Sequence, residues 1–368
     1  MNGPRPAIQQ TTCQLFLALG IGLTGLACDV EPGILVDPGS DTCGGCHPGQ
    51  HAAWAVSGHA ASMVSPVFLA MLPHVEASWG ADARDTCVGC HQPDHGPDHA
   101  IGCVSCHAAV GNREERDGLL LVDLGLPVAG PFSDPVPTAA HGSRQSDLVA
   151  SPSLCGTCHE VSGPRHFVEQ TLTEYRASPA AAAGETCATC HFPRTDVGAA
   201  ALGGPTDRPL ADHRAVGFAP VRLASALTLE LSGASDGRSF DVRLTNTGAG
   251  HHVPTGVSFL RDIYVDVILT DATGAEHLTP RAIDLRSHLT RDGYEVALAT
   301  DADQIVSHAL APEEAAEAHI GAPAALVSPI RAEAVLRARE IRKDALLALD
   351  LGEMLDAFPV QDVVRVAR

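Results

Sequence analysis

Cys43-Gly44-Gly45-Cys46-His47 is the first of five copies of the pattern Cys-x-x-Cys-His, and this pattern decides how the first half of the chain folds. The other copies begin at Cys87, Cys103, Cys155 and Cys187. In one turn of helix, residues i, i+3 and i+4 share a face, so both thiols and the imidazole of each copy can reach one flat cofactor. This pattern is typical of the attachment of a c-type haem, in which both cysteines form thioethers and the histidine binds the iron.

The motifs therefore predict five covalently attached haems c. The cysteines that would form the thioether bonds are Cys43, Cys46, Cys87, Cys90, Cys103, Cys106, Cys155, Cys158, Cys187 and Cys190. The proximal iron ligands would be His47, His91, His107, His159 and His191. Pairs of Cys-x-x-Cys motifs can also bind zinc, but five motifs that each end in His do not divide into four-ligand sites.

The N-terminus resembles a secretory signal peptide over residues 1–27. Arg5 supplies positive charge, and residues 15–27 form an apolar run that is short for a membrane span. Cleavage before Cys28 would give either a lipoprotein, with the lipid on Cys28, or a plain secreted chain; a retained anchor is a third alternative. In each case we expect an exported protein of the periplasm or cell envelope, because bacteria attach c-type haem outside the inner membrane.

The composition indicates which partners the protein can bind and what fills its core. The formal net charge of −20 argues against nucleic acid as a partner, which would require a basic surface. Only 4% of the residues are aromatic, which is little for a chain of 368 residues. We expect haem, which is large, flat and mostly apolar, to fill much of the core of the first half.

The pattern along the chain predicts a mixed fold with two domains. Residues 28–218 would form a haem-packed, mainly α and irregular pentahaem cytochrome domain, with short helical patches in residues 49–60 and 168–177. The motifs are separated by 39, 11, 47 and 27 residues, which excludes a regular repeat. The 11-residue link places the second and third haems next to each other in this interpretation.

Residues 219–368 contain no motif and alternate between apolar and polar side chains. Such alternation predicts half-buried strands around residues 227–231, 240–244 and 263–269, with a turn at residues 271–274. We expect a small antiparallel β-sandwich, followed by a C-terminal tail with one more strand or a short helix over residues 345–354.

The second axial position of each iron decides its chemistry, since a second His gives a six-coordinate electron carrier and an open position can bind substrate. Of the 19 histidines, 14 lie outside the motifs, which favours bis-His iron. His59 follows Ser57-Gly58 on a predicted helix and is the strongest candidate, with His141 and His213 next. His95 and His99 flank the shortest link, and we select His99, although the sequence leaves His95 open; His51, His74 and His166 are weaker candidates.

The segment from Asn246 to Gly256 offers a further candidate, His251, inside the β region. Glycines at positions 248, 250 and 256 allow the backbone to approach a bulky group. We predict that His251 reaches an iron of the first domain, with His252 as the alternative. An ordinary turn with two exposed histidines is the competing interpretation.

The chain resembles the bacterial multihaem cytochromes c related to the tetrahaem cytochrome of nitrifiers, a group that includes hydroxylamine oxidoreductase and the pentahaem nitrite reductases. The resemblance covers most of residues 40–270. It rests on the motifs, on the stretch from His47 through Trp54 to Ala60, on Glu160 after the fourth motif and on Phe192-Pro193 after the fifth. Asn246 to Gly256, followed by Arg261, resembles a C-terminal β domain of uncharacterised members. The resemblance implies packed bis-His haems that pass electrons along a row, with His59, His141 and His213 as distal ligands.

Two departures from that group argue against its enzymes. The nitrite reductases replace the motif His by Lys at the catalytic haem, whereas all five motifs here end in His. Hydroxylamine oxidoreductase bonds a Tyr to its catalytic haem, and neither Tyr175, Tyr264 nor Tyr294 stands in a comparable setting.

We therefore expect an electron carrier between a quinol-linked donor and a terminal acceptor at the envelope. The alternative is an oxidoreductase that acts on a small nitrogen or sulfur species at one open haem, with His74, His95 or His99 as acid–base groups. A third hypothesis makes the β domain a docking module for a partner protein or for further copies of the chain.

Overall fold

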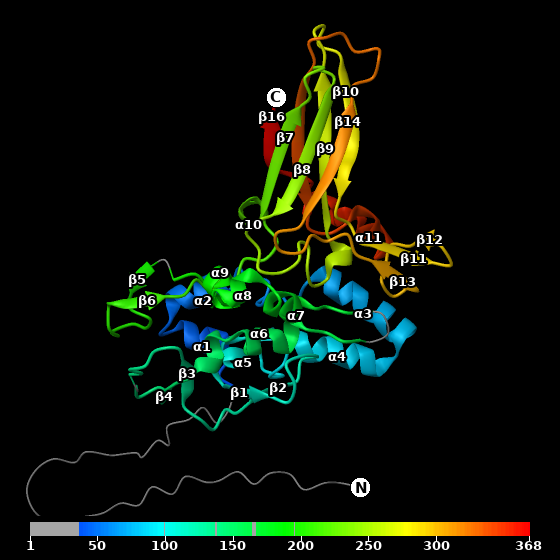
Figure 1. The fold of residues 1–368 in the computed structure, drawn as a ribbon. Helices are drawn as coiled ribbons and strands as arrows, with labels where there is room; N and C mark the ends of the chain where they lie inside the picture. The colour runs from blue at the N-terminus through cyan, green and yellow to red at the C-terminus, as the bar shows by residue number, and fades with distance from the viewer. Residues whose placement is uncertain (1–36, 99, 137, 164–166, 195) are drawn as a thin grey trace, which may run out of the picture. The chain divides into compact units, whose positions relative to one another are not determined.

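The structure is a computed structural model, and it describes residues 37–98, 100–136, 138–163, 167–194 and 196–368 (Figure 1). Residues Gly33–Arg368 group into one unit by their contacts. The predicted boundary at residue 218 therefore stays a prediction. The predicted signal peptide, Cys13 and Cys28 lie outside the described residues, as do His99 and His166.

Short helices carry the five motifs, as the spacing predicts. The helices of this part are α1 (Ser40–Gly44), α2 (Pro48–Trp54), α3 (Pro66–Trp79), α4 (Ala81–His91), α5 (Cys103–His107), α6 (Pro152–His159), α7 (Thr171–Arg176), α8 (Pro179–Ala182) and α9 (Cys187–His191). Motifs two to five lie at or within α4, α5, α6 and α9. The first motif continues from α1 through a turn in which the N–H of His47 donates to the carbonyl of Cys43 at 2.9 Å.

Local sequence explains where several of these helices begin. Ser65, Ser151 and Ser178 each accept a hydrogen bond from the backbone of the first turn, and a proline follows each of them at the first helical position. Thr186 and Thr189 form a capping box in front of the last motif. Side-chain caps therefore fix the starts of α3, α6, α8 and α9, of which α6 and α9 carry motifs.

Where the structure describes them, the segments between and after the motif helices form three two-stranded sheets and one 3₁₀ helix. The pairs are β1 (Ala109–Asn112) with β2 (Leu120–Val122), β3 (Val128–Gly130) with β4 (Ser143–Gln145), and β5 (Asp196–Gly198) with β6 (Arg208–Leu210). The 3₁₀ helix η1 (Asp147–Ala150) precedes α6. The first and third pairs are antiparallel and the second is parallel.

Long strands dominate the chain after α10 (Pro220–Ala226), and they include the three predicted strands. One antiparallel sheet has the order β10-β9-β15-β16, another has the order β14-β8-β7, and a small one has the order β12-β11-β13. The strands are β7 (Leu227–Gly233), β8 (Ser239–Asn246), β9 (Asp262–Thr270), β10 (Glu276–Asp284), β11 (His288–Arg291), β12 (Tyr294–Glu295), β13 (Gln304–Val306), β14 (Ala315–Gly321), β15 (Arg331–Arg339) and β16 (Gln361–Ala367). Figure 1 shows β7, β8, β9, β10 and β14 running side by side.

Three short helices complete this part: η2 (Ser258–Leu260), α11 (Lys343–Ala348) and η3 (Gly352–Asp356). The helix expected over residues 345–354 and the extra C-terminal strand are thus both present, as α11 with η3 and as β16. The predicted turn also forms, because the N–H of Gly274 donates to the carbonyl of Asp271 at 3.0 Å.

The apolar core lies mainly in the β part. The two larger sheets share one cluster of buried side chains, which includes Leu244, Val265, Val267 and Leu336. A second cluster packs Val67 of α3 against Leu346 of α11 and its neighbours. All of the largest fully buried side chains of the described chain fall between Leu227 and Leu346.

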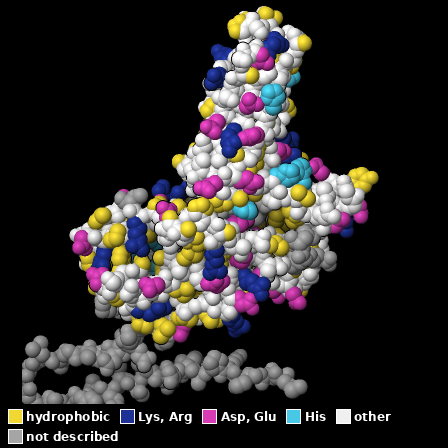
Figure 2. Space-filling model, viewed as in Figure 1, with side chains coloured by type: hydrophobic (Ala, Val, Ile, Leu, Met, Phe, Trp, Pro, Cys, Tyr) yellow, Lys and Arg dark blue, Asp and Glu magenta, His cyan; other side chains and the backbone are white. Residues whose placement is uncertain are grey.

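The motif part is built differently. Its buried apolar residues are few and often small, such as Ala100, Ala108, Ala109 and Ala129. Eleven of the 17 exposed large apolar side chains belong to residues 37–226, and Figure 2 shows such side chains gathered on the viewed face of this part. Among the described residues, no helix is both long and apolar enough to cross a membrane.

Candidate haem-binding sites

Four of the five motif histidines face a second imidazole from a distant part of the chain. The ring centroids are 6.2 Å apart for His47 and His141, 6.3 Å for His107 and His213, 6.2 Å for His191 and His251, and 6.4 Å for His159 and His59. The ring planes of the first three pairs lie within 19–21° of each other, and those of the fourth are inclined by 56°. The structure thus brings four of the five distal candidates to motif histidines.

These separations fit two imidazoles bound to opposite sides of one iron. An imidazole nitrogen binds a transition metal at about 2 Å and the ring centroid lies about 1 Å further away, so the two centroids would be roughly 6 Å apart. Packed aromatic rings also occur at such distances. The distances alone therefore do not distinguish two packed rings from two rings that bind one iron, but the hydrogen bonds of the rings do.

In seven of these histidines, four from the motifs and three of their distal partners, Nδ1 forms a hydrogen bond with a backbone carbonyl. For the motif histidines the distances are 2.6 Å from His47 to Ala200, 2.8 Å from His91 to Ser62, 2.7 Å from His107 to Ala129 and 3.2 Å from His191 to Val216. For the distal ones they are 3.0 Å from His141 to Gly142, 2.9 Å from His213 to Ala211 and 2.8 Å from His251 to His252.

Such contacts fix the tautomer of each ring. Because a carbonyl only accepts, the hydrogen must be on Nδ1, which leaves the lone pair on Nε2. Within the described chain, none of these seven Nε2 atoms has a hydrogen-bond partner. A ring nitrogen that donates to a carbonyl while the other is free to bind metal is the usual arrangement around ligating histidines.

Burial favours the neutral form, which is the form that binds metal, in six of the paired or motif rings. It lowers the pKa of His59, His91, His107, His191 and His213. The pKa of His159 falls to about 4, mainly through burial and further through neighbouring imidazoles such as His59 and His191. Tautomer, charge and spacing therefore all fit a haem at these sites.

The second motif differs from the other four. Its His91 stacks on Phe68, with ring centroids 3.7 Å apart and planes inclined by 9°, and no second imidazole faces it among the residues that the structure describes. His99, our candidate here, lies outside the described residues. His51 is engaged elsewhere, since its Nε2 lies 3.0 Å from a carboxylate oxygen of Asp41.

The motif thiols show which sites are neighbours. Three pairs of thiols from different motifs lie close enough to shift each other's pKa: Cys43 with Cys103, Cys90 with Cys158, and Cys155 with Cys187. Motif one therefore lies beside motif three, and motif four lies beside motifs two and five. Cys106 of motif three acts electrostatically on both thiols of motif four, so motif four stands at the centre of the group.

The expectation that the 11-residue link makes the second and third haems neighbours stays a prediction. The Ser62 hydroxyl bridges the two motifs, since it donates to the carbonyl of His91 at 2.7 Å and accepts from the N–H of Ile101 at 3.0 Å. Other bonds of the link hold motif three beside motif one. Asp98, inside the link, accepts hydrogen bonds from the backbone and hydroxyl of Ser40 at 2.6–2.9 Å, and the N–H of Cys103 donates to the Ser40 hydroxyl at 3.1 Å. These bonds hold the start of motif three against α1, beside motif one.

The loop from Asn246 to Gly256 places His251 opposite His191. Buried Asn246 donates to the carbonyls of His251 (2.9 Å) and Leu310 (3.0 Å) and accepts from the N–H of Ala249 (3.1 Å). A Cβ at Gly248 would lie 2.1 Å from the carbonyl oxygen of Ser225. The close backbone approach predicted from the glycines is therefore present.

One carboxylate of the motif part holds this loop in place. Glu174 on α7 accepts from the backbone N–H of His252 (3.1 Å) and from the Thr255 hydroxyl (2.6 Å), and the Thr171 and Thr255 hydroxyls are 2.8 Å apart. His251, and not the alternative His252, is the ring paired with His191. The sequence carried no signal for Glu174, because an isolated glutamate on a short helix has no distinguishing pattern.

Another buried group that the sequence did not reveal is Glu169. Burial raises the pKa of its carboxyl to about 7, and its charge raises the pKa of the Cys87 thiol. Glu169 therefore lies near the second motif. No group of three or more His, Cys, Asp or Glu side chains within the described residues could hold a metal ion by itself.

Comparison with known proteins shows a shared fold. No protein-family model matches the chain, and no curated protein matches it. The chain is similar to the crystal structure of a penta-haem cytochrome c552 from Thermochromatium tepidum, with a TM-score of 0.71 at 18% identity over 90% of this chain and 98% of that one. A putative ApaA protein from Bordetella pertussis matches 38% of the chain at 16% identity, but its TM-score of 0.17 supports no shared fold.

Proposed function

We propose that the protein is an exported pentahaem c-type cytochrome that passes electrons between respiratory partners. The observation that carries the proposal is the set of four imidazole pairs, in three of which both Nδ1 atoms are held by carbonyls. When bound, haem c supplies a one-electron redox couple. The residues of the chain supply covalent attachment, two axial nitrogens and a buried setting.

The ligand assignment follows from the pairs. His47 and His141 would hold the first iron, His107 and His213 the third, His159 and His59 the fourth, and His191 and His251 the fifth. His91 would hold the second, and His99 remains our candidate opposite it. The ten motif cysteines would form the thioethers.

The contacts between motifs favour an electron carrier over five isolated sites. The neighbouring thiols relate motif four to motifs two, three and five, and motif three to motif one. Such packing would let electrons pass from one site to the next through motif four. The shared fold with a penta-haem cytochrome supports the same interpretation, as does the resemblance to the nitrifier cytochrome group.

The proposal extends to location and partners. The signal-like N-terminus favours the periplasm or cell envelope, with Cys28 as a lipid attachment site, and the redox partners would be a quinol-linked donor and a terminal acceptor. The two larger sheets, which share one core, would form a β-sandwich whose 246–256 loop supplies His251.

The test is spectroscopic. Protein produced in a host that matures c-type haem should contain five haems by intact mass and by haem assay. Electron paramagnetic resonance of the oxidised protein should show low-spin bis-His iron at the four paired sites. Colourless protein with the mass of the bare peptide would exclude the proposal.

A second candidate function is an oxidoreductase that acts on a small nitrogen or sulfur species at the second motif. It is favoured by one observation: within the described residues, His91 faces no second imidazole, while the carboxyl of Glu169 is buried near Cys87. A high-spin signal that shifts with nitrite, hydroxylamine or cyanide would support this function. Five low-spin signals that do not change with any of the three ligands would exclude this function and support the electron carrier.

A further inference from the structure

The β part contains a cationic hollow that none of the predicted iron sites uses. Arg281, Arg286, Arg342 and Lys343 line it together with the carboxylates of Asp262 and Asp344, around a volume of about 360 Å³. This volume lies at the lower end of ligand sites in proteins. Lys343 is the only lysine in the whole sequence of 368 residues.

The backbone at Arg281 is arranged to aim its side chain at this hollow. The register between β9 and β10 shifts between Thr279 and Ile283, and Arg281 adopts a φ of 48°, a conformation that side chains disfavour. Its N–H donates to Asp266 at 2.8 Å, and its guanidinium donates to both oxygens of Asp262 at 2.7 and 2.9 Å. The guanidinium also lies over the Tyr264 ring, 3.9 Å from its centroid.

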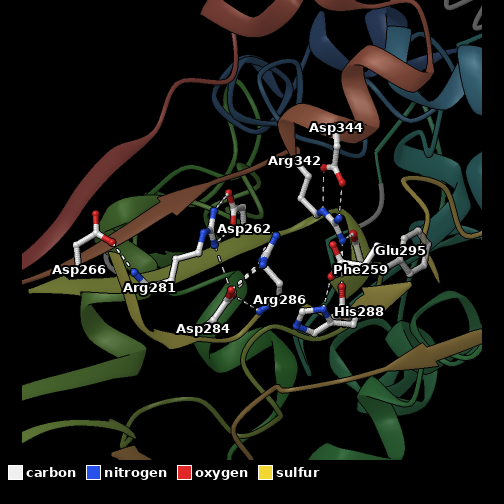
Figure 3. A network of polar contacts seen from close by, with 11 residues as sticks. Phe259, Asp262, Asp266, Arg281, Asp284, Arg286, His288, Glu295, Arg342 and Asp344 are labelled. Atoms are coloured by element: carbon white, nitrogen blue, oxygen red, sulfur yellow. Dashed lines mark hydrogen bonds and ion pairs between the residues drawn. The ribbon is translucent and has the colours of Figure 1, made fainter. Parts of the chain in front are cut away.

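The other two arginines, Arg286 and Arg342, are likewise held by hydrogen bonds and ion pairs (Figure 3). Arg286 donates through Nε to the two oxygens of Asp284 at 2.9 and 3.2 Å, and Figure 3 shows Arg281 directed at the same carboxylate. Arg342 is buried, donates to the carbonyl of Ser287 at 3.0 Å and pairs with Asp344. These bonds hold the guanidinium groups in place before any ligand arrives.

The lining of the hollow keeps donors that a ligand could use. It contains four cations and two carboxylates, those of Asp262 and Asp344. Within the described residues, Lys343 forms no ion pair, and Nη1 of Arg286 has no hydrogen-bond partner. An ammonium group and guanidinium N–H donors therefore stay free at the hollow, in a chain whose net charge is −20.

We propose that this hollow binds a small oxyanion of the sulfate or phosphate type. The free Nη1 of Arg286 can donate to an oxygen of such an anion, and the Lys343 ammonium adds a point charge. Because the bonds of Arg281 to Asp262 and of Arg342 to Asp344 already fix the surrounding side chains, less ordering is required on binding. The site would act independently of the iron sites.

Calorimetry of the haem-loaded protein with sodium sulfate, against sodium chloride at matched ionic strength, tests the site. Arg286→Gln and Lys343→Gln remove its free donors but leave the Arg281–Asp262 pair and buried Arg342 intact. We expect each to weaken sulfate binding by about tenfold. Arg291→Gln is the matched control, because Arg291 is exposed on β11 outside the hollow, and it should bind sulfate as the original protein does.

The single lysine provides a second readout. Acetylation of Lys343, followed by mass spectrometry, should slow in sulfate but not in chloride. In Arg286→Gln, the same protection should require about ten times more sulfate. Absence of a sulfate-specific heat together with unprotected Lys343 would overturn the proposal. Equal weakening by Arg291→Gln would overturn it as well, because binding would then reflect general charge.

Discussion

The two halves of the molecule are held together by different means. Among the described residues, the largest fully buried side chains all lie within 227–346, and the two larger sheets there share one apolar core. The motif part orders its chain through imidazole pairs, thiol contacts and side chains bonded to backbone, and many of its large apolar side chains stay exposed. The comparison indicates that the β part folds around its own side chains, whereas the motif part needs bound haem to complete its core.

The largest expected effect comes from omitting the haems. Without maturation of c-type haem, residues 37–217 lack the groups that tie the paired histidines together, so their amides should lose protection from hydrogen exchange. Strands β8, β9 and β15 should keep theirs, because their core consists of side chains. Hydrogen exchange measured by mass spectrometry on both forms would test this difference; unchanged protection of the motif part would refute it.

A cavity in the β core should give the next largest effect. Leu336→Ala removes a side chain that is 0% exposed, and we expect it to lower the free energy of unfolding of the β strands by about 2–5 kcal/mol. Leu278→Ala, at a position that is 50% exposed on β10, should cost less than about 0.5 kcal/mol. Denaturant unfolding followed by exchange of the β amides gives both values, and similar values for the two variants would contradict a side-chain core.

The same contrast explains what the sequence could predict. The motif turns, the alternating strands and the loop glycines are local patterns, so their elements were predictable. The partner of each distal histidine was not. His59 follows the first motif closely but faces His159, and His141 precedes the fourth motif but faces His47.

These pairings depend on how distant segments pack, which no local pattern records. The contact of the third motif with α1 is another case, because it depends on the Ser40–Asp98 bonds between segments far apart in the sequence. Glu174 is a third, since its role appears only when the 246–256 loop lies against α7. Sequence reasoning thus found the groups that bear chemistry but not the contacts that arrange them.

His251, the predicted iron ligand from the β part, should affect only one iron when it is removed. We expect His251→Ala to convert one of five irons from low spin to high spin, and added imidazole to restore it. His252→Ala is the matched control and should keep the low-spin signal, because the His252 ring is not paired with a motif histidine. Electron paramagnetic resonance before and after imidazole measures this, and an unchanged low-spin count in His251→Ala would remove His251 from the ligand set.

The smallest effect should come from the carboxylate that holds the His251 loop. Glu174→Ala leaves the N–H of His252 and the hydroxyl of Thr255 without their acceptor, at a cost of about 1–3 kcal/mol if both stay buried. The iron should keep both axial nitrogens, but looser orientation of His251 should broaden or shift its low-spin resonance. Glu174→Gln keeps one acceptor oxygen and should restore much of the original spectrum.

Glu115→Ala provides the control for this last change. Glu115 forms an ion pair at 2.5 Å with Arg176, which lies on α7 as Glu174 does. Glu115 has no hydrogen bond or ion pair to the described 246–256 loop. Its loss should therefore leave the spectrum as it is. If Glu115→Ala and Glu174→Ala altered the resonance equally, the effect would come from α7 in general. Glu174 would then have no particular role in setting the orientation of the His251 ring.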